Sequence, residues 1–285
     1  MYKKYDFNEN YFNKLKTHEQ AYILGFIYAD GYNSNSRLEL SQKEERIDIL
    51  EKINKALKSN VPIKSYSPGT YRLSFNSIKL CSDLTKLGAV KNKSLTLIFP
   101  DFIPDKLMSS FILGYFNGDG CIWNGKRKKM IVKDSSRKEG FRERIVHNVK
   151  FTFTGCVSFI DPLQKYLIKI GIVKRKTKLN YSKAKNPNTP TCDKVCTMEY
   201  SGRKQIKNFY EYMYSKAPIW CNEKKLKFEE IFCASDEKSS VETALTEETA
   251  EMPIVNQAPN IGEGSSTIPE MGVGSSGPKY AAPNE

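Results

Sequence analysis

Residues 23–31 read ILGFIYADG, and residues 112–120 read ILGYFNGDG, so the same pattern recurs 89 residues further along the chain. Each copy carries a glycine and a second small residue four positions later, which places both on one face of a helix. A face without bulky side chains lets two helix backbones approach closely. The paired pattern therefore predicts that two helices pack against each other through Gly25, Ala29, Gly114 and Gly118.

Each copy ends on an aspartate, Asp30 or Asp119, followed by glycine. A carboxylate at a helix C-terminus faces the negative end of the macrodipole, at a cost of about 0.3–1 kcal/mol. If the helices pack, the two carboxylates converge, and their repulsion at about 4 Å is about 4 kcal/mol at an effective dielectric near 20. A cation between them would remove both costs, and Mg²⁺ accepts one or two carboxylates together with phosphate oxygens. The plain alternative is that Asp-Gly is a common turn.

These two motifs make the chain resemble the LAGLIDADG homing endonucleases. The resemblance covers about residues 18–232 and includes NKSLTLIFP at 92–100 and the PDKLMSSF that leads into the second motif. It implies an α+β fold of two tandem pseudo-symmetric αββαββα units, 1–107 and 108–234, that form a DNA-binding saddle with the motif helices packed at its centre. It also implies site-specific hydrolysis of both DNA strands that leaves short 3′ overhangs.

The resemblance assigns roles to individual residues. Asp30 and Asp119 would be catalytic ligands of Mg²⁺ or of another divalent cation such as Mn²⁺, and the carbonyls of Ala29 and Gly118 are further candidate ligands. A polar and basic ring around the metals would include Gln42, Arg46, Lys91 and Lys224. The second unit departs from this pattern, because FTFTGCVSF has Gly155 and Phe159 where the first unit has Gln42 and Arg46. Lys91, Arg46 and Lys224 have ordinary surface charge as their alternative interpretation.

Periodicity away from the motifs predicts the remaining elements. In the N-terminal half it indicates a helix from Thr17 to Gly31, an unassigned short strand, strands near 37–41, 61–66 and 71–76, and helices near 47–57 and 77–88. In the C-terminal half it indicates a helix from Pro104 to Gly120, strands near 147–154, 177–182 and 195–201, and helices near 157–170, 203–214 and 223–232.

Alternate residues of a strand face one side of a sheet, so the predicted strands supply candidate DNA-binding side chains. Arginine and asparagine can read guanine and adenine, whereas lysine more often contacts phosphates. An ordinary solvated sheet face would give the same pattern. The candidates are Arg37, Glu39, Lys64, Tyr66, Arg72, Ser74 and Asn76 in the first unit and Lys150, Thr152, Thr154, Lys176, Lys178 and Asn180 in the second.

Charge is distributed unevenly along the 285 residues. The chain has 45 Lys and Arg against 32 Asp and Glu, a net charge of +13. Residues 235–285 carry nine acids and two lysines, a charge of −7, which leaves +20 on residues 1–234. A body this basic favours a polyanion such as DNA or RNA. The acidic segment is poor in aromatic residues and is predicted to be a disordered tail.

The basic segment 124–147 is predicted to be an extended hairpin or loop. Its phosphate contacts, on one side only, would make the DNA target long and asymmetric.

Other classes fit the sequence less well. The longest apolar stretch is shorter than a membrane span, and MYKKYDFNEN lacks a signal-peptide core. Seven cysteines without a Cys-x-x-Cys pair favour a reducing compartment, the cytoplasm or an organellar matrix, and only two histidines disfavour an HNH or His-rich zinc centre. The protein is expected to be a monomer in which the two similar units of one chain form a pseudo-dimer. Two alternative functions remain on the same fold. The chain could be an RNA-splicing maturase that binds intron RNA, or a DNA-binding regulator without catalytic activity.

Overall fold

The computed structural model of the chain describes residues 4–91, 93–132, 141–182 and 192–233. All of them fall in one compact unit, Met1–Ser240. The predicted acidic tail at 235–285 lies outside the described residues, as does the centre of the predicted basic insertion at 133–140. The division of the body into units 1–107 and 108–234 stays a prediction, and below these parts are called the N-terminal and C-terminal halves.

The N-terminal half follows the predicted order of helices and strands. It begins with a helix whose N-cap, Thr17, accepts from the backbone of Gln20 and completes a capping box. The short strand expected after Gly31 is present as the first strand. Its elements are α1 (His18–Asp30), β1 (Gly31–Asn33), β2 (Arg37–Lys43), the 3₁₀ turn η1 (Glu44–Arg46), α2 (Ile47–Ala56), β3 (Lys64–Ser67), β4 (Thr70–Asn76), α3 (Ile78–Lys86) and the turn η2 (Lys93–Leu95).

The C-terminal half repeats this order. Its elements are α4 (Asp105–Asp119), β5 (Gly120–Val132), β6 (Phe141–Cys156), α5 (Val157–Lys169), β7 (Asn180–Ser182), β8 (Cys192–Ser201) and α6 (Arg203–Tyr214), and a further helix spans residues 222–233. The predicted insertion is a long hairpin on both sides of residues 133–140, because β5 and β6 stay paired up to Val132 and Phe141. Sequence periodicity alone did not predict β5, and it placed the start of β6 six residues too late.

Each half contains one four-stranded antiparallel sheet. The strand orders are β1-β2-β4-β3 and β5-β6-β8-β7, which are the same order in the two halves. In the first sheet Leu38, Leu40, Leu73 and Phe75 are buried on one face. In the second sheet the buried face includes Phe151, Phe153 and Met198. Strand alternation places the neighbouring side chains on the opposite face of each sheet, and most of these side chains are polar.

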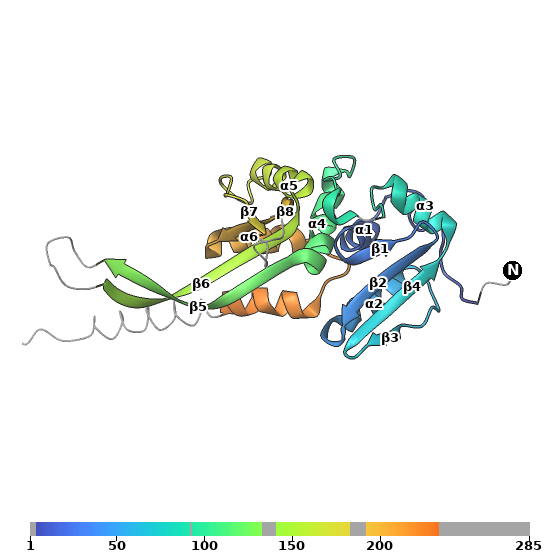
Figure 1. Ribbon diagram of the computed structural model, residues 1–285, viewed down its shortest axis with the longest axis horizontal. Coiled ribbons are helices and arrows are strands. Elements are labelled where there is room, and N and C mark those ends of the chain that lie inside the picture. The colour runs from blue at the N-terminus through green and yellow to red at the C-terminus, as the bar shows by residue number, and fades with distance from the viewer. Residues whose placement is uncertain (1–3, 92, 133–140, 183–191, 234–285) are drawn as a thin grey trace, which may run out of the picture. The chain divides into compact units, whose positions relative to one another are not determined.

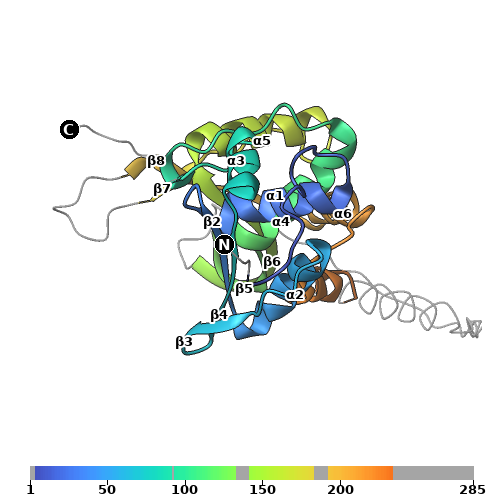
Figure 2. The same cartoon turned by 90° about the vertical axis from the view of Figure 1, so that its right-hand side faces the viewer.

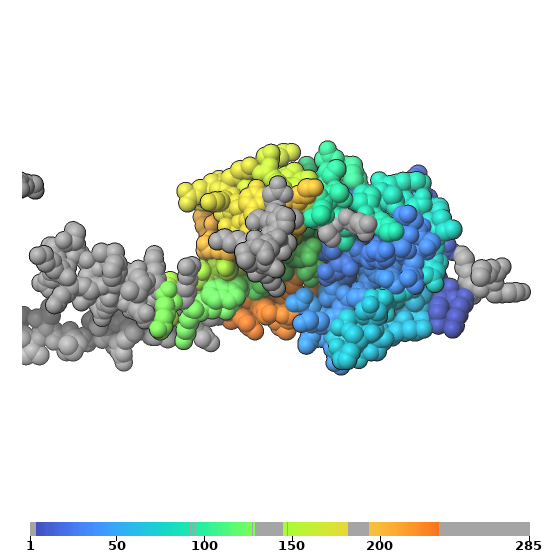
Figure 3. Space-filling view, in the orientation of Figure 1, coloured from blue at the N-terminus to red at the C-terminus, as the bar shows by residue number. Residues whose placement is uncertain are grey.

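The helices α1 and α4 lie side by side between the two sheets (Figures 1 and 2). Nearly every residue of α1 from Ala21 to Tyr28, and of α4 from Leu107 to Asn117, is buried. A helix that is apolar all round belongs in the interior of a protein. The two halves therefore join along these two helices. Figure 3 shows the N-terminal half in blue and cyan beside the C-terminal half in green to orange.

Candidate active site and nucleic-acid surface

The contact between α1 and α4 leaves no space for side chains at three glycines. A Cβ atom on Gly25 would lie 2.0 Å from the Phe111 carbonyl oxygen, and one on Gly114 would lie 1.9 Å from the Tyr22 carbonyl oxygen. One turn later, a Cβ atom on Gly118 would lie 2.3 Å from the Cβ atom of Ala29. The structure thus brings together the four small residues that the motifs predict, and backbone meets backbone.

This contact brings the two aspartates together, since Asp30 is the last residue of α1 and Asp119 the last of α4. Loss of solvent, and next the negative charge of Asp30, raise the pKa of Asp119 to about 6, although its side chain keeps an exposed edge. Loss of solvent also raises the pKa of Asp30. Each carboxyl group therefore ionises less readily than a solvated one, and a cation would reverse both shifts.

Two lysines bind the carbonyl groups at these helix ends. The Lys93 ammonium donates to the carbonyls of Ala29 at 3.1 Å and Gly31 at 2.6 Å. Burial lowers the pKa of Lys93, and the two aspartates oppose this shift. The carbonyl of Ala29, a predicted metal ligand, therefore already has one lysine partner.

Lys224 does the same for α4 and is only 3% exposed. Its ammonium lies within hydrogen-bonding distance of four carbonyls, which share its three protons. They belong to Phe116 at 2.7 Å, Asn117 at 2.8 Å, Gly118 at 3.4 Å and Gly120 at 2.6 Å. Burial, and then the charge of Arg46, lower the pKa of Lys224 to about 8. A cation at a helix C-terminus stabilises the macrodipole, so both lysines offset the placement of aspartates there.

The predicted ring residues of the N-terminal half divide into two groups. Gln42 is buried, and its amide donates to the Asp30 carboxylate at 2.5 Å. Arg46 donates to Glu223 at 2.5 Å, and its charge favours ionised Asp30. Lys91 is exposed and makes neither of the contacts that Lys93 makes. The structure thus places Lys93, two residues beyond the predicted lysine, beside the aspartates, and no local pattern distinguishes these two lysines.

Aromatic residues replace the polar ring in the C-terminal half. Phe159 is fully buried and stacks on Tyr115 with ring centroids 4.1 Å apart. The Tyr115 hydroxyl donates to the Thr154 carbonyl at 2.9 Å and also favours ionised Asp119. Tyr115 was not predicted as a site residue, because a tyrosine within an apolar helix is normally part of the core.

An open cavity of about 220 Å³ lies beside Asp119, and Ala29, Lys93, Tyr115 and Gly155 are among the residues that line it. The residues that the structure describes contain no group of three or more His, Cys, Asp or Glu side chains suited to a metal ion. The protein ligands offered here are therefore the carboxylates of Asp30 and Asp119. This is the donor set that Mg²⁺ uses when waters and substrate phosphates complete its shell.

The predicted DNA-binding residues of the first sheet share its polar face. Register pairs Glu39 with Ser74 and Arg37 with Asn76. Arg72 lies over the Tyr66 ring at 3.3 Å and donates to Ser41 at 3.1 Å. Lys64 and Tyr66 are exposed on β3. This face therefore presents hydrogen-bonding side chains that are held in place by their neighbours.

The second sheet has a similar polar face. Lys150, Thr152 and Thr154 lie opposite Ser201, Glu199 and Thr197 in the register of β6 and β8, and Asn180 of β7 pairs with Thr197. Lys150 forms an ion pair with Glu199 at 2.7 Å. Two predicted residues differ from expectation, because Lys176 and Lys178 precede β7 in a loop, and Lys176 binds Asp161 at 2.5 Å.

A membrane-spanning role finds no support in the described ranges, where no helix combines the length and the apolar character that a span requires. Six cysteines in these ranges are free thiols, and four of them are buried. Cys196 is one of the buried four, and the side chain of Cys192 lies outside the described residues.

Comparison with known proteins gives one family and a set of similar folds. Residues 106–214, which include the second motif, match the family described as LAGLIDADG-like domain. No curated protein matches the chain. Similar solved structures include the LAGLIDADG meganuclease I-AabMI bound to uncleaved DNA, at 15% identity over 77% of this chain and 91% of that one, with a TM-score of 0.48.

Two other similar structures were solved with DNA. The I-LtrWI LAGLIDADG homing endonuclease is 14% identical over 87% of this chain and 99% of its own, with a TM-score of 0.49. Meganuclease I-SmaMI is 12% identical over 79% and 92%, with a TM-score of 0.47. The match of residues 106–214 to the LAGLIDADG-like domain confirms the resemblance that the second motif predicts.

Proposed function

We propose that the chain is a metal-dependent, site-specific DNA endonuclease. The observation that carries this proposal is the convergence of Asp30 and Asp119 at the ends of two packed helices, where each carboxyl group has a raised pKa. The polar faces of two sheets flank these helices, on a body of strongly basic composition. The match of residues 106–214 to the LAGLIDADG-like domain supports the same class of activity.

Asp30 and Asp119 would hold the divalent cation, for which we propose Mg²⁺ or Mn²⁺. Such an ion supplies an activated water and neutralises charge on the departing oxygen of a phosphodiester. Gln42 fixes the orientation of the Asp30 carboxylate through its 2.5 Å hydrogen bond. Lys93 and Lys224 hold the carbonyl groups of both helix ends, so the carboxylates stay aimed at the same place. The carbonyls of Ala29 and Gly118 remain secondary candidate ligands, because lysines already contact them.

The substrate would be a long, asymmetric duplex bound across both polar sheet faces. Two aspartates allow one carboxylate to serve each strand, which gives a double-strand break, and we propose short 3′ overhangs as the product. A single chain that contains both aspartates would act as a monomer. The free cysteines suit a reducing compartment such as the cytoplasm or an organellar matrix.

The direct test incubates the wild-type chain and Mg²⁺ with the uninterrupted sequence of the locus that encodes it. We expect cleavage of both strands at one position. Tight binding without cleavage, in Mg²⁺ and in Mn²⁺, would contradict the nuclease assignment and favour a DNA-binding regulator. Tight binding to the intron RNA in place of the duplex would favour a maturase.

The aspartate roles need a separate test. Asp30→Asn and Asp119→Asn should each slow double-strand cleavage by at least about 100-fold, the usual effect of removing a group that stabilises transition-state charge. Binding in Ca²⁺, which tests recognition without cleavage, should change little. Asp101→Asn, a change on an exposed turn, is the matched control. Normal cleavage by either aspartate variant would remove that residue from the centre.

A further inference from the structure

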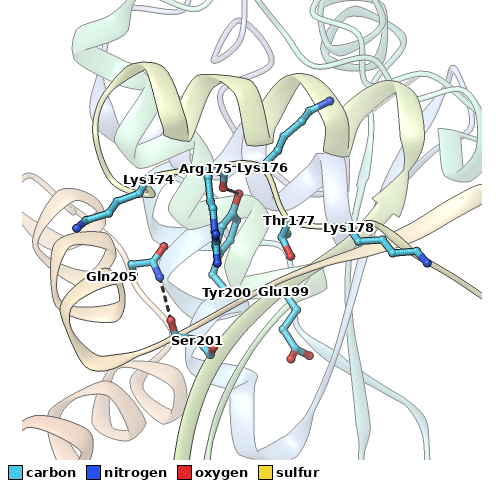
Figure 4. Close-up of a pocket in the computed structure, with 9 residues that line it drawn as sticks. All are labelled: Lys174, Arg175, Lys176, Thr177, Lys178, Glu199, Tyr200, Ser201 and Gln205. Carbon is cyan, nitrogen blue, oxygen red and sulfur yellow. Dashed lines mark hydrogen bonds between the residues drawn. The ribbon is translucent and has the colours of Figure 1, made fainter.

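The loop that follows α5 carries an unusual concentration of positive charge. Residues 174–178 read KRKTK, with four cationic side chains in five residues. Together with Ser201 and Gln205, this loop lines an open cavity of about 650 Å³ (Figure 4). The cavity is therefore large enough for a phosphate group and its hydration shell.

Three of the four cations have no acidic partner among the described residues. Lys176 forms an ion pair with Asp161 at 2.5 Å. Lys174, Arg175 and Lys178 make no ion pair with any residue that the structure describes. In Figure 4 the guanidinium of Arg175 lies beside Tyr200 in the middle of the cavity, while Lys174 and Lys178 extend at opposite ends. One acid, Glu199, lines the cavity, and it binds Lys150. The cavity thus has an uncompensated positive charge.

The corresponding loop of the N-terminal half is quite different. Counted from the left-handed residues Lys58 and Gly171 that follow α2 and α5, the segment VPIKS at 61–65 occupies the place of KRKTK. The cavity at this place is smaller, about 220 Å³, and Val61 and Pro62 are among the residues that line it. Its arginine, Arg72, already contacts Tyr66 and Ser41. Lys64 is the other cation that lines this cavity, so the N-terminal cavity has two lining cations where the C-terminal cavity has four.

The next helix shows the same difference. In the N-terminal half, Ser77 caps α3 by accepting from the Leu80 amide, and its hydroxyl donates to the Glu9 carboxylate at 2.5 Å. In the C-terminal half, Gly202 caps α6 without any side-chain hydrogen bond, and the first turn holds no acid. Glu9 thus supplies a negative group at the start of α3. No described residue supplies such a group at the start of α6.

Position on the sheet indicates which anion fits. Glu199 and Ser201 belong to β8, where they lie opposite Thr152 and Lys150 on the polar face proposed to bind DNA. The cavity therefore continues that face beyond its edge. Hydroxyl, amide and cationic donors around one space match the oxygens of a phosphodiester, and such contacts position a duplex without reading its sequence.

We propose that Lys174 and Arg175, with Ser201 and Gln205, form a phosphate-binding pocket that holds the DNA backbone at the outer end of the C-terminal half. This inference rests on the proposed binding of DNA. It predicts asymmetric binding of the DNA backbone, in which the C-terminal half makes more phosphate contacts at its outer end than the N-terminal half does.

The test compares two double variants of equal charge. Lys174→Gln/Arg175→Gln removes two exposed cations of the pocket. Lys106→Gln/Lys207→Gln removes two exposed cations that do not line the cavity, one from α4 and one from α6. Affinity for a generic duplex is measured by fluorescence anisotropy over a range of KCl concentrations without divalent metal, so the readout does not depend on cleavage.

Each phosphate contact contributes about −0.9 to the slope of log affinity against log salt. The slope of the pocket variant should therefore be shallower than the wild-type slope by one or two times about 0.9. The control variant should keep the wild-type slope. Equal slopes in the two variants would overturn the pocket even though the chain binds DNA. A loss seen with structured RNA but not with the duplex would overturn it as well. Absence of salt-dependent duplex binding by the wild type would instead contradict the proposed function.

Discussion

Asp30 and Asp119 end equivalent helices, but their surroundings differ. Asp30 accepts a hydrogen bond from the Gln42 amide, and Arg46 adds positive charge nearby. Beside Asp119 the Tyr115 ring stacks on Phe159, and a Cβ atom on Gly155 would lie 2.3 Å from the Tyr115 hydroxyl. What the two halves share is backbone geometry, and what they vary is the chemistry around each acid. Equivalent changes at the helix contact should therefore affect the free energy of unfolding equally in the two halves. Changes around the two aspartates should affect the cleavage of the two DNA strands unequally.

The shared geometry can be broken at its closest contact. Gly25→Ala and Gly114→Ala should each lower the free energy of unfolding by about 3 kcal/mol, because the added methyl group overlaps a backbone oxygen and the helices must separate. Urea denaturation measures this change. Lys106→Ala, on the exposed first turn of α4, should stay within about 0.5 kcal/mol of wild type. Stability unchanged in only one glycine variant would show that the two halves are not equivalent here.

The unequal chemistry can be measured strand by strand. Gln42→Ala removes a hydrogen bond to a charged group, worth about 1.5 kcal/mol, so it should slow one of the two strand cleavages about tenfold and let nicked plasmid accumulate. Tyr115→Phe leaves the aromatic packing intact and should slow cleavage less. The ratio of nicked to linear plasmid separates the two variants. Linear product without nicks in both would mean that the acids act as one group.

The helix contact also differs between its two ends. Tyr22 accepts from the Asn117 amide at 2.8 Å, whereas the residues in the equivalent places, Phe111 and Tyr28, meet as rings 5.1 Å apart. Tyr22→Phe should cost about 1 kcal/mol, because it leaves a buried amide without its partner. Adding Asn117→Leu should recover part of that loss. Additive losses in the double variant, measured by urea denaturation, would argue against coupling between the two side chains.

The smallest expected effect is on acid stability. Partial burial raises the pKa of Glu223, but Arg46 and Lys227 outweigh it and lower the pKa to about 2. A carboxyl group with a lowered folded-state pKa stabilises the fold above its ordinary pKa near 4.5, and this contribution is lost as the pH falls toward 2. Because the pair is partly exposed, the effect should stay below about 1 kcal/mol. Glu223→Gln should flatten the melting temperature between pH 5 and 2, and an unchanged profile would contradict the pairing.

The sequence predicted the features that depend on local pattern. Glycine spacing gave the helix contact, and strand alternation gave the polar faces on which Arg37, Ser74 and Lys150 lie. Features that depend on long-range paths were not predictable. Lys93 rather than Lys91 approaches the aspartates because of how an irregular segment passes the helix ends. Arg46 meets Glu223 across 177 residues of chain, so no local pattern could reveal the pair.

The unlike ends of the α1–α4 contact bear on which helices can pair. Two copies of the C-terminal half would bring Asn117 against Phe111 at both ends and bury two amides without partners. Two copies of the N-terminal half would bring Tyr22 against Tyr28 and crowd both ends. If the chain were split into two polypeptides, the mixed pair would therefore be the preferred complex. The polar contact at one end and the aromatic contact at the other therefore favour pairing of an N-terminal half with a C-terminal half.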